Sequence, residues 1–270
     1  MPVSRLRSAV RLTGFILLTA VLLPIYALSL GPFLRTRRPI QVFWCRLVCV
    51  LCGLTVRVSG TRHDGGATLF VSNHVSYLDI PVLSRLIEAT FVAKSEVADW
   101  PLFGLIARLT GTVFVDRLSS KARGQRAEIR RRLAGGENLL LFAEGTSTDG
   151  TAVAPFKSAL MDVAVDSAAP ANCVVQPVSV TYPRARDGSP LTGARAQHYA
   201  WYGDKTLAPH LWQMLGRPGA EAEVQFHPPV HPASFADRKS LARHCYAAVA
   251  SGVAAAHARA YSGWNKHAAE

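Results

Sequence analysis

Acidic residues are scarce in this 270-residue sequence, in which 18 Asp and Glu stand against 30 Lys and Arg, giving a net charge of +12. Such an excess favours an anionic partner, which can be nucleic acid, acidic lipid headgroups or an acidic protein. The sequence lacks zinc-finger spacing and an aromatic RNA-binding signature, which argues against nucleic acid. With hydrophobic residues at 49% and charged residues at 18%, the composition also excludes a disordered chain.

The sequence also lacks a disulfide framework, because its five cysteines are odd in number and have no framework spacing. Reduced thiols in a protein that faces the cytosol fit this usage best. Cys45, Cys49 and Cys52 form a C-x3-C-x2-C pattern that also occurs in iron–sulfur radical enzymes. Here the pattern lies in an apolar segment, and on a helix the three thiols share one face. We therefore interpret them as small packed side chains.

Several catalytic signatures are absent. There is no G-x-S-x-G nucleophile elbow, because Asp149 stands where the last glycine would be. There is no H-E-x-x-H zinc motif and no phosphate-binding G-x-x-x-x-G-K-[ST] loop. Nothing in the sequence predicts a metal site.

What the N-terminus does have is a long apolar run. Leu12 to Leu34 contains 23 residues without a charge, which as a helix is about 35 Å long, near the hydrocarbon thickness of a bilayer. Pro24 interrupts this run. A second apolar run, Ile40 to Val58, carries Arg46 near its middle, which makes it a better interfacial helix than a spanning one.

Basic residues flank the first run on both sides, so the positive-inside rule gives no orientation; they are Arg5, Arg7 and Arg11 before it and Arg35, Arg37 and Arg38 after it. Two arrangements stay open, a single membrane span and a helical hairpin that enters one leaflet. We favour the hairpin because of Pro24, Arg46 and the balanced flanks. The second apolar segment argues against a cleaved signal peptide.

The turn-like stretch from Gly60 to Gly66 predicts a boundary between a helical membrane anchor, residues 1–59, and a catalytic domain, residues 60–270. In that domain apolar strands alternate with helices, which predicts an α/β fold with a mixed sheet flanked by helices. The expected strands are 68–72, 91–94, 111–117, 138–142, 174–180 and 223–226. The expected helices are 80–87, 100–109, 118–133, one beginning near 155, and 238–261.

A histidine and a carboxylate follow the strand expected at 68–72, where His74 and Asp79 are five residues apart. Imidazole is the side chain best suited to take a proton near neutral pH, and a carboxylate fixes its tautomer and stabilises its charged form. The spacing requires a turn that brings Asp79 back toward His74. The alternative is a capped helix start, with Asn73 or Ser76 at the cap.

Four motifs in order carry a resemblance to a known family. They are NHVSYLD from Asn73, GTVFVDR from Gly111, FAEGTST from Phe142 with PFKSAL from Pro155, and VQPVSVTY from Val175. Together they resemble the glycerolipid acyltransferases of the lysophosphatidic acid acyltransferase type, over residues 60–185. That family joins a fatty acyl group from a thioester to a lipid hydroxyl.

The resemblance implies roles for individual residues. His74 is the expected general base on the acceptor hydroxyl, with Asp79 as its partner. The expected substrate-binding residues are Asn73, Phe114, Arg117, Glu144, Gly145 and Thr146, with Arg117 directed at a phosphate. No cofactor is expected, since the thioester of acyl carrier protein or CoA supplies the leaving group. The protein is expected at the cytoplasmic face of a bacterial inner membrane.

The third motif departs from the usual Phe-Pro-Glu-Gly-Thr-Arg-Ser. Ala143 replaces the proline, Ser147 replaces the arginine that contacts phosphate, and Thr148 replaces the serine. Because most of the family acts on lysophosphatidic acid, that acceptor, with phosphatidic acid as product, is expected first. Lyso-ornithine lipid is expected second, since acyltransferases on that lipid carry a similar Glu-Gly-Thr-Thr/Ser-x-Asp-Gly run. The alternative of another class is a thioesterase or lipid hydrolase that uses His74 and Asp79 on water.

Overall fold

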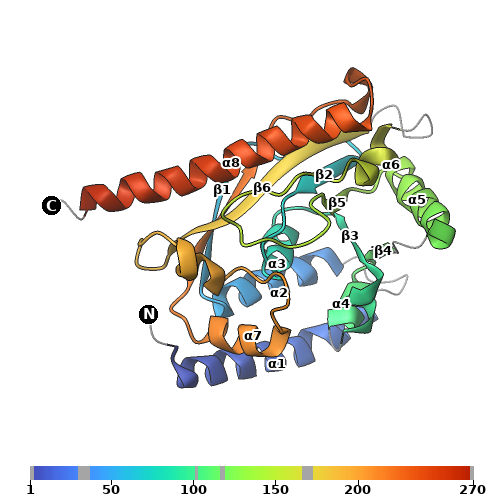
Figure 1. Cartoon of the computed structure of the whole chain (residues 1–270). Coiled ribbons are helices and arrows are strands. Elements are labelled where there is room, and N and C mark those ends of the chain that lie inside the picture. The colour runs from blue at the N-terminus through green and yellow to red at the C-terminus, as the bar shows by residue number, and fades with distance from the viewer. Residues whose placement is uncertain (1–2, 30–36, 101–102, 116–118, 166–172, 268–270) are drawn as a thin grey trace.

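A seven-stranded mixed sheet lies at the centre of the computed structural model, in the order β1-β7-β6-β2-β5-β3-β4 (Figure 1). Its strands are β1 (Leu54–Ser59), β2 (Thr68–Ser72), β3 (Thr90–Lys94), β4 (Val113–Val115), β5 (Leu139–Phe142), β6 (Val174–Ala185) and β7 (Ala220–Phe226). Neighbours run parallel except β6 and β7, which are antiparallel. The structure describes residues 3–29, 37–100, 103–115, 119–165 and 173–267. The predicted α/β class with a mixed sheet is confirmed.

The central strands have both faces covered. All five residues of β2 are buried, as expected for a parallel strand between two layers, where the sequence is continuously apolar. Successive side chains point to opposite faces, so Phe70 belongs to one hydrophobic core while Leu69 and Val71 belong to the other. The sheet therefore separates two cores.

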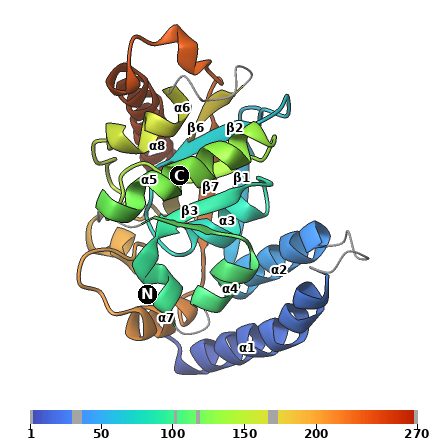
Figure 2. The same cartoon turned by 90° about the vertical axis from the view of Figure 1, so that its right-hand side faces the viewer.

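Eight α-helices are described: α1 (Arg5–Leu28), α2 (Arg37–Leu51), α3 (Asp79–Ser84), α4 (Phe103–Leu109), α5 (Ser119–Ala134), α6 (Asp162–Val165), α7 (Leu207–Leu215) and α8 (Arg238–His267). Helices α5, α6 and α8 contribute buried side chains to one core, and α2, α3 and α7 contribute them to the other. Helix α1 lies outside α2 and α7, on the far side of the sheet from α8 (Figures 1 and 2).

In the first apolar run, helix α1 continues through Pro24 to Leu28. The expectation for the second apolar run is wrong. It is not one helix to Val58, because α2 ends at Leu51 and β1 follows. Gly53 lies between them with φ of 71°, a conformation that suits glycine. Strand β1 then pairs with β7 at the edge of the sheet.

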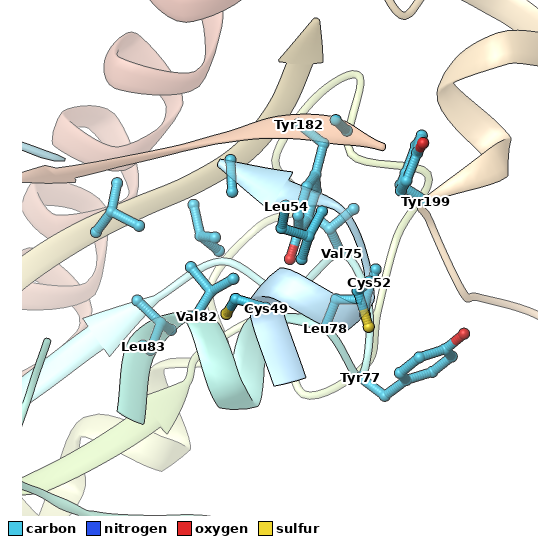
Figure 3. Packing of buried hydrophobic residues seen from close by; sticks show 14 of the residues in the cluster. Cys49, Cys52, Leu54, Val75, Tyr77, Leu78, Val82, Leu83, Tyr182 and Tyr199 are labelled. Atoms are coloured by element: carbon cyan, nitrogen blue, oxygen red, sulfur yellow. The ribbon is translucent and has the colours of Figure 1, made fainter. Parts of the chain in front are cut away.

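The clustered cysteines pack as expected. Cys45, Cys49 and Cys52 are buried and free, and Figure 3 shows Cys49 and Cys52 beside Leu78 and Val82 of the α3 region. Their small side chains let α2 approach α3 closely. The expected packing of these three side chains in the core is therefore found.

Candidate active site

His74 and Asp79 form a direct pair at the end of the central strand β2. The Nδ1 atom of His74 lies 2.8 Å from Oδ2 of Asp79. A carboxylate oxygen only accepts, so this bond places the proton on Nδ1 and leaves the lone pair on Nε2. The imidazole also stacks on Phe142 at the end of β5, with ring centroids 4.0 Å apart. Because β2 and β5 are parallel neighbours, their carboxyl ends bring these two rings together.

Asp79 is fully buried and is held by four donors. Its Oδ2 atom accepts from the backbone amides of Val75 and Ser76, at 2.7 and 3.0 Å, as well as from His74. Its Oδ1 atom accepts from the Tyr182 hydroxyl at 2.8 Å. Burial and the neighbouring Asp79 raise the pKa of Tyr182 above its usual value, which keeps that hydroxyl a donor. The turn required by the five-residue spacing is therefore built around the carboxylate of Asp79, while the first residue of α3 has no side-chain cap from Asn73 or Ser76.

Glu144 ties the segment after β5 to His74. One carboxylate oxygen accepts from the backbone amide of His74 at 2.6 Å, and the other accepts from that of Ala154 at 2.7 Å. Only 2% of the Glu144 residue surface is exposed. Burial raises the pKa of its carboxyl to about 7, against the opposing effect of these two amides. Glu144 thus sets the position of the His74 backbone from the neighbouring strand.

A cavity of about 610 Å³ opens beside His74. Apolar side chains of α1 and α2 line its depth, among them Phe15, Leu22, Trp44 and Val48. The cavity is also lined by His74, by Gly145, Thr146 and Ser147, and by the charged residues Lys94, Glu96 and Asp204. One site therefore combines a proton acceptor, a polar wall and a long apolar space.

Asn73 and Phe114, two further predicted site residues, lie outside the cavity lining. Both polar atoms of the Asn73 side chain bond to the backbone of Val180, at 2.8 and 2.9 Å, so this side chain joins β2 to β6. Asn73, Phe114 and Glu144 do not line the cavity; Phe114 lies on the edge strand β4. Arg117, expected to meet a phosphate, lies outside the described residues.

Comparison with known proteins identifies the family of this chain. A family model described as Acyltransferase matches residues 54–181. The lyso-ornithine lipid O-acyltransferase of Brucella abortus (strain 2308) is 42% identical over 211 residues, covering 77% of this chain and 79% of the relative. The chain belongs to the glycerolipid acyltransferase family. The 1-acyl-sn-glycerol-3-phosphate acyltransferase of Neisseria gonorrhoeae is 30% identical, covering 78% of both chains.

A solved acyltransferase has the same fold. The 1-acyl-sn-glycerophosphate (LPA) acyltransferase PlsC from Thermotoga maritima superposes with a TM-score of 0.62 at 21% identity, covering 90% of this chain and 96% of that one. The family resemblance expected from the four motifs is confirmed.

Sequence reasoning left two contacts of this acyltransferase unassigned. Tyr182 belongs to the fourth motif, but its bond to Asp79 joins residues 103 positions apart. The backbone amide of Trp201 donates to the carbonyl oxygen of Val75 at 3.0 Å, which fixes the residue after His74 from a distant loop. No spacing rule in the sequence points from Trp201 to His74.

Proposed function

We propose that this acyltransferase moves a fatty acyl group from a thioester of acyl carrier protein or CoA to the hydroxyl of lyso-ornithine lipid. Four relatives with that activity in their names are 36–42% identical to the chain, whereas the named 1-acyl-sn-glycerol-3-phosphate acyltransferases of Neisseria are 30% identical. This ranking reverses the order expected from the motifs, in which lysophosphatidic acid came first.

The observation that carries the choice of acceptor is Ser147 in the wall of the cavity. The usual family motif has an arginine at this position, which contacts phosphate. A neutral hydroxyl supplies neither the positive charge nor the paired donors of arginine, whose hydrogen bond to a charged group is worth roughly 1.5–3 kcal/mol. The wall beside His74 is therefore better suited to a headgroup without phosphate.

The charges around the cavity support a zwitterionic headgroup. An ornithine headgroup offers a carboxylate and an ammonium group. Lys94 lines the cavity, and Lys157 lies against Gly145, where an added Cβ would come within 3.0 Å of its Nζ atom. Glu96 and Asp204, also in the lining, supply carboxylates. Both signs of charge are thus present around the cavity that His74 lines.

The chemistry follows from the tautomer of His74. Nε2 takes the proton of the acceptor hydroxyl while the oxygen attacks the thioester carbonyl, since an alcohol is a poor nucleophile until it loses that proton. Asp79 stabilises the imidazolium that forms. When the tetrahedral intermediate collapses, the carbon–sulfur bond breaks, and the departing sulfur takes the proton from Nε2 as a thiol. The apolar depth of the cavity offers space for an acyl chain and keeps water from competing.

The acceptor preference is tested by Ser147→Arg. We expect the wild-type enzyme to have a higher kcat/KM for lyso-ornithine lipid than for lysophosphatidic acid. The new arginine should shift the ratio about ten- to a hundredfold toward lysophosphatidic acid, because it restores a phosphate contact and repels the ammonium group. The measurement is kcat/KM on both acceptors with one labelled acyl donor, with products identified by mass spectrometry.

Ala152→Arg is the matched control, because it adds the same charge to an exposed position of the same loop outside the cavity. It should leave the ratio unchanged. A wild-type preference for lysophosphatidic acid would refute the proposed acceptor. Equal consumption of the thioester with and without any lyso-lipid would instead identify a thioesterase.

We also propose that α1 and α2 anchor the enzyme in one leaflet of the membrane. Among the described residues, α1 is the one helix long and apolar enough to cross a bilayer. Its first turns, however, are bonded to the end of α7 and to the residues that follow it. Ser8 donates to the carbonyl oxygen of Trp212 at 2.8 Å, and Arg11 donates to those of Leu215 and Arg217 at 3.0 and 2.6 Å. A helix held along the catalytic domain in this way fits an interfacial position, with its outer apolar residues in lipid.

A cysteine probe at Arg37, the first residue of α2, tests this topology. In the one-leaflet arrangement we expect Arg37→Cys to resist an impermeant maleimide applied to intact cells and to react after permeabilisation. The five native cysteines are all buried, which keeps the background low. The control is Arg5→Cys, at the exposed first residue of α1, which should give the same pattern. Labelling of Arg37→Cys in intact cells would establish a membrane span instead.

A further inference from the structure

The loop that follows β5, from Glu144 to Ala154, packs against the His74 backbone. Glu144 closes the base of this loop by accepting from the amides of His74 and Ala154. Thr148 donates from its amide to the carbonyl oxygen of His74 at 2.9 Å. Gly150 rests on the next residue, Val75, so closely that an added Cβ would lie 2.7 Å from a Val75 methyl group. Movement of the loop must therefore move the His74 backbone or open a gap beside it.

A histidine from the C-terminal helix holds this loop from outside. The Nε2 atom of His257, on α8, lies 2.9 Å from the carbonyl oxygen of Gly150 and 3.3 Å from Oγ1 of Thr181. A carbonyl oxygen carries no hydrogen, so Nε2 must donate to it. His257 lies outside the stretch matched by the family model, residues 54–181.

The contact links His257 to the same strand that supports Asp79. Thr181 and Tyr182 are consecutive on β6 and therefore point to opposite faces of the sheet. Thr181 meets His257 on the α8 side, and Tyr182 donates to Asp79 on the α3 side. One strand thus fixes both the carboxylate partner of His74 and, through His257, the loop that lies against Val75.

We propose that His257 is a positioning residue for acyl transfer, which holds the loop from Glu144 to Ala154 through its bond to Gly150 and thereby fixes His74. The inference rests on the proposed role of His74, but not on the identity of the acceptor. A displacement of about 1 Å at a reacting group can reduce the rate about a hundredfold, so loss of this bond should lower kcat more than it raises KM.

Two amide variants separate the hydrogen bond from packing. In His257→Gln the side-chain NH2 occupies the place of Nε2, whereas in His257→Asn it is one methylene short of Gly150. We expect kcat of the full-length enzyme in detergent micelles to stay within about threefold for His257→Gln and to fall at least about tenfold for His257→Asn, with smaller changes in KM. Amide exchange of the loop around Gly150 should be faster in His257→Asn alone.

Arg259→Ala is the control on the same helix, since it breaks an exposed ion pair with Glu223 without touching the loop. It should leave kcat and loop exchange unchanged. Equal kcat for His257→Gln and His257→Asn, or an equal loss for Arg259→Ala, would overturn the proposal. If neither His257 variant folds, His257 is needed for the stability of the fold, and the proposal is overturned as well. The proposed function is tested separately, by the wild-type acceptor preference.

Discussion

His74→Ala should lower kcat by about 10²–10⁴-fold, the usual contribution of a general base, while the fold survives. The fold should survive because the backbone bonds of position 74 to Glu144 and Thr148 do not involve the imidazole. Asp79 keeps the amides of Val75 and Ser76 and the Tyr182 hydroxyl as partners. The measurement is single-turnover acyl transfer together with thermal unfolding of the same preparation.

His63→Ala is the matched control for this variant. His63 also uses Nδ1 in a side-chain hydrogen bond, to Thr68 at 3.0 Å, but it does not line the cavity. Its replacement should change kcat by less than about twofold, as expected for a residue that touches no reacting group. A folded His74→Ala enzyme that keeps more than about a tenth of the wild-type kcat would contradict the base assignment.

The pairing of His74 with Asp79 could be predicted from the sequence because it is local. Only a five-residue turn separates the two groups, and the apolar run before them predicts where the strand ends. The central strands β2, β5 and β6 were equally clear, since each contains a run of mostly apolar residues, as expected for strands that are buried on both faces.

The contacts that complete the site could not be predicted, because they join distant segments. Tyr182 reaches Asp79 across 103 positions, and His257 reaches Gly150 across 107. Which side chains meet at such separations depends on sheet order and helix placement, which no spacing pattern specifies. Strand β1 was not predicted, for a different reason. Leu54, Val56 and Val58 alternate with polar residues, a strand signal that the apolar run around Arg46 concealed.

Asp79→Asn should separate the charge of this residue from its hydrogen bonds. An asparagine has one acceptor oxygen and one NH2 group in place of two oxygens. The oxygen should face the three donors now on Oδ2, those of His74, Val75 and Ser76, because an NH2 group there would meet three hydrogens. The NH2 group then faces Tyr182, whose hydroxyl can turn to accept. The tautomer of His74 is retained, and the variant loses mainly the negative charge.

We therefore expect Asp79→Asn to fold and to lose about 10²–10³ in kcat, since about 3–4 kcal/mol of support for the imidazolium is removed. Asp79→Ala should behave differently. It leaves two buried backbone amides and Tyr182 without their acceptor, so it should lose activity and also about 2–5 kcal/mol of unfolding free energy. Unfolding curves and kcat for both variants give the comparison, with Asp64→Asn, an exposed carboxylate paired with Arg62, as the control. Near-wild-type kcat in Asp79→Asn would show that charge is not the contribution of Asp79. Unchanged stability in Asp79→Ala would show that the turn around His74 does not depend on this carboxylate.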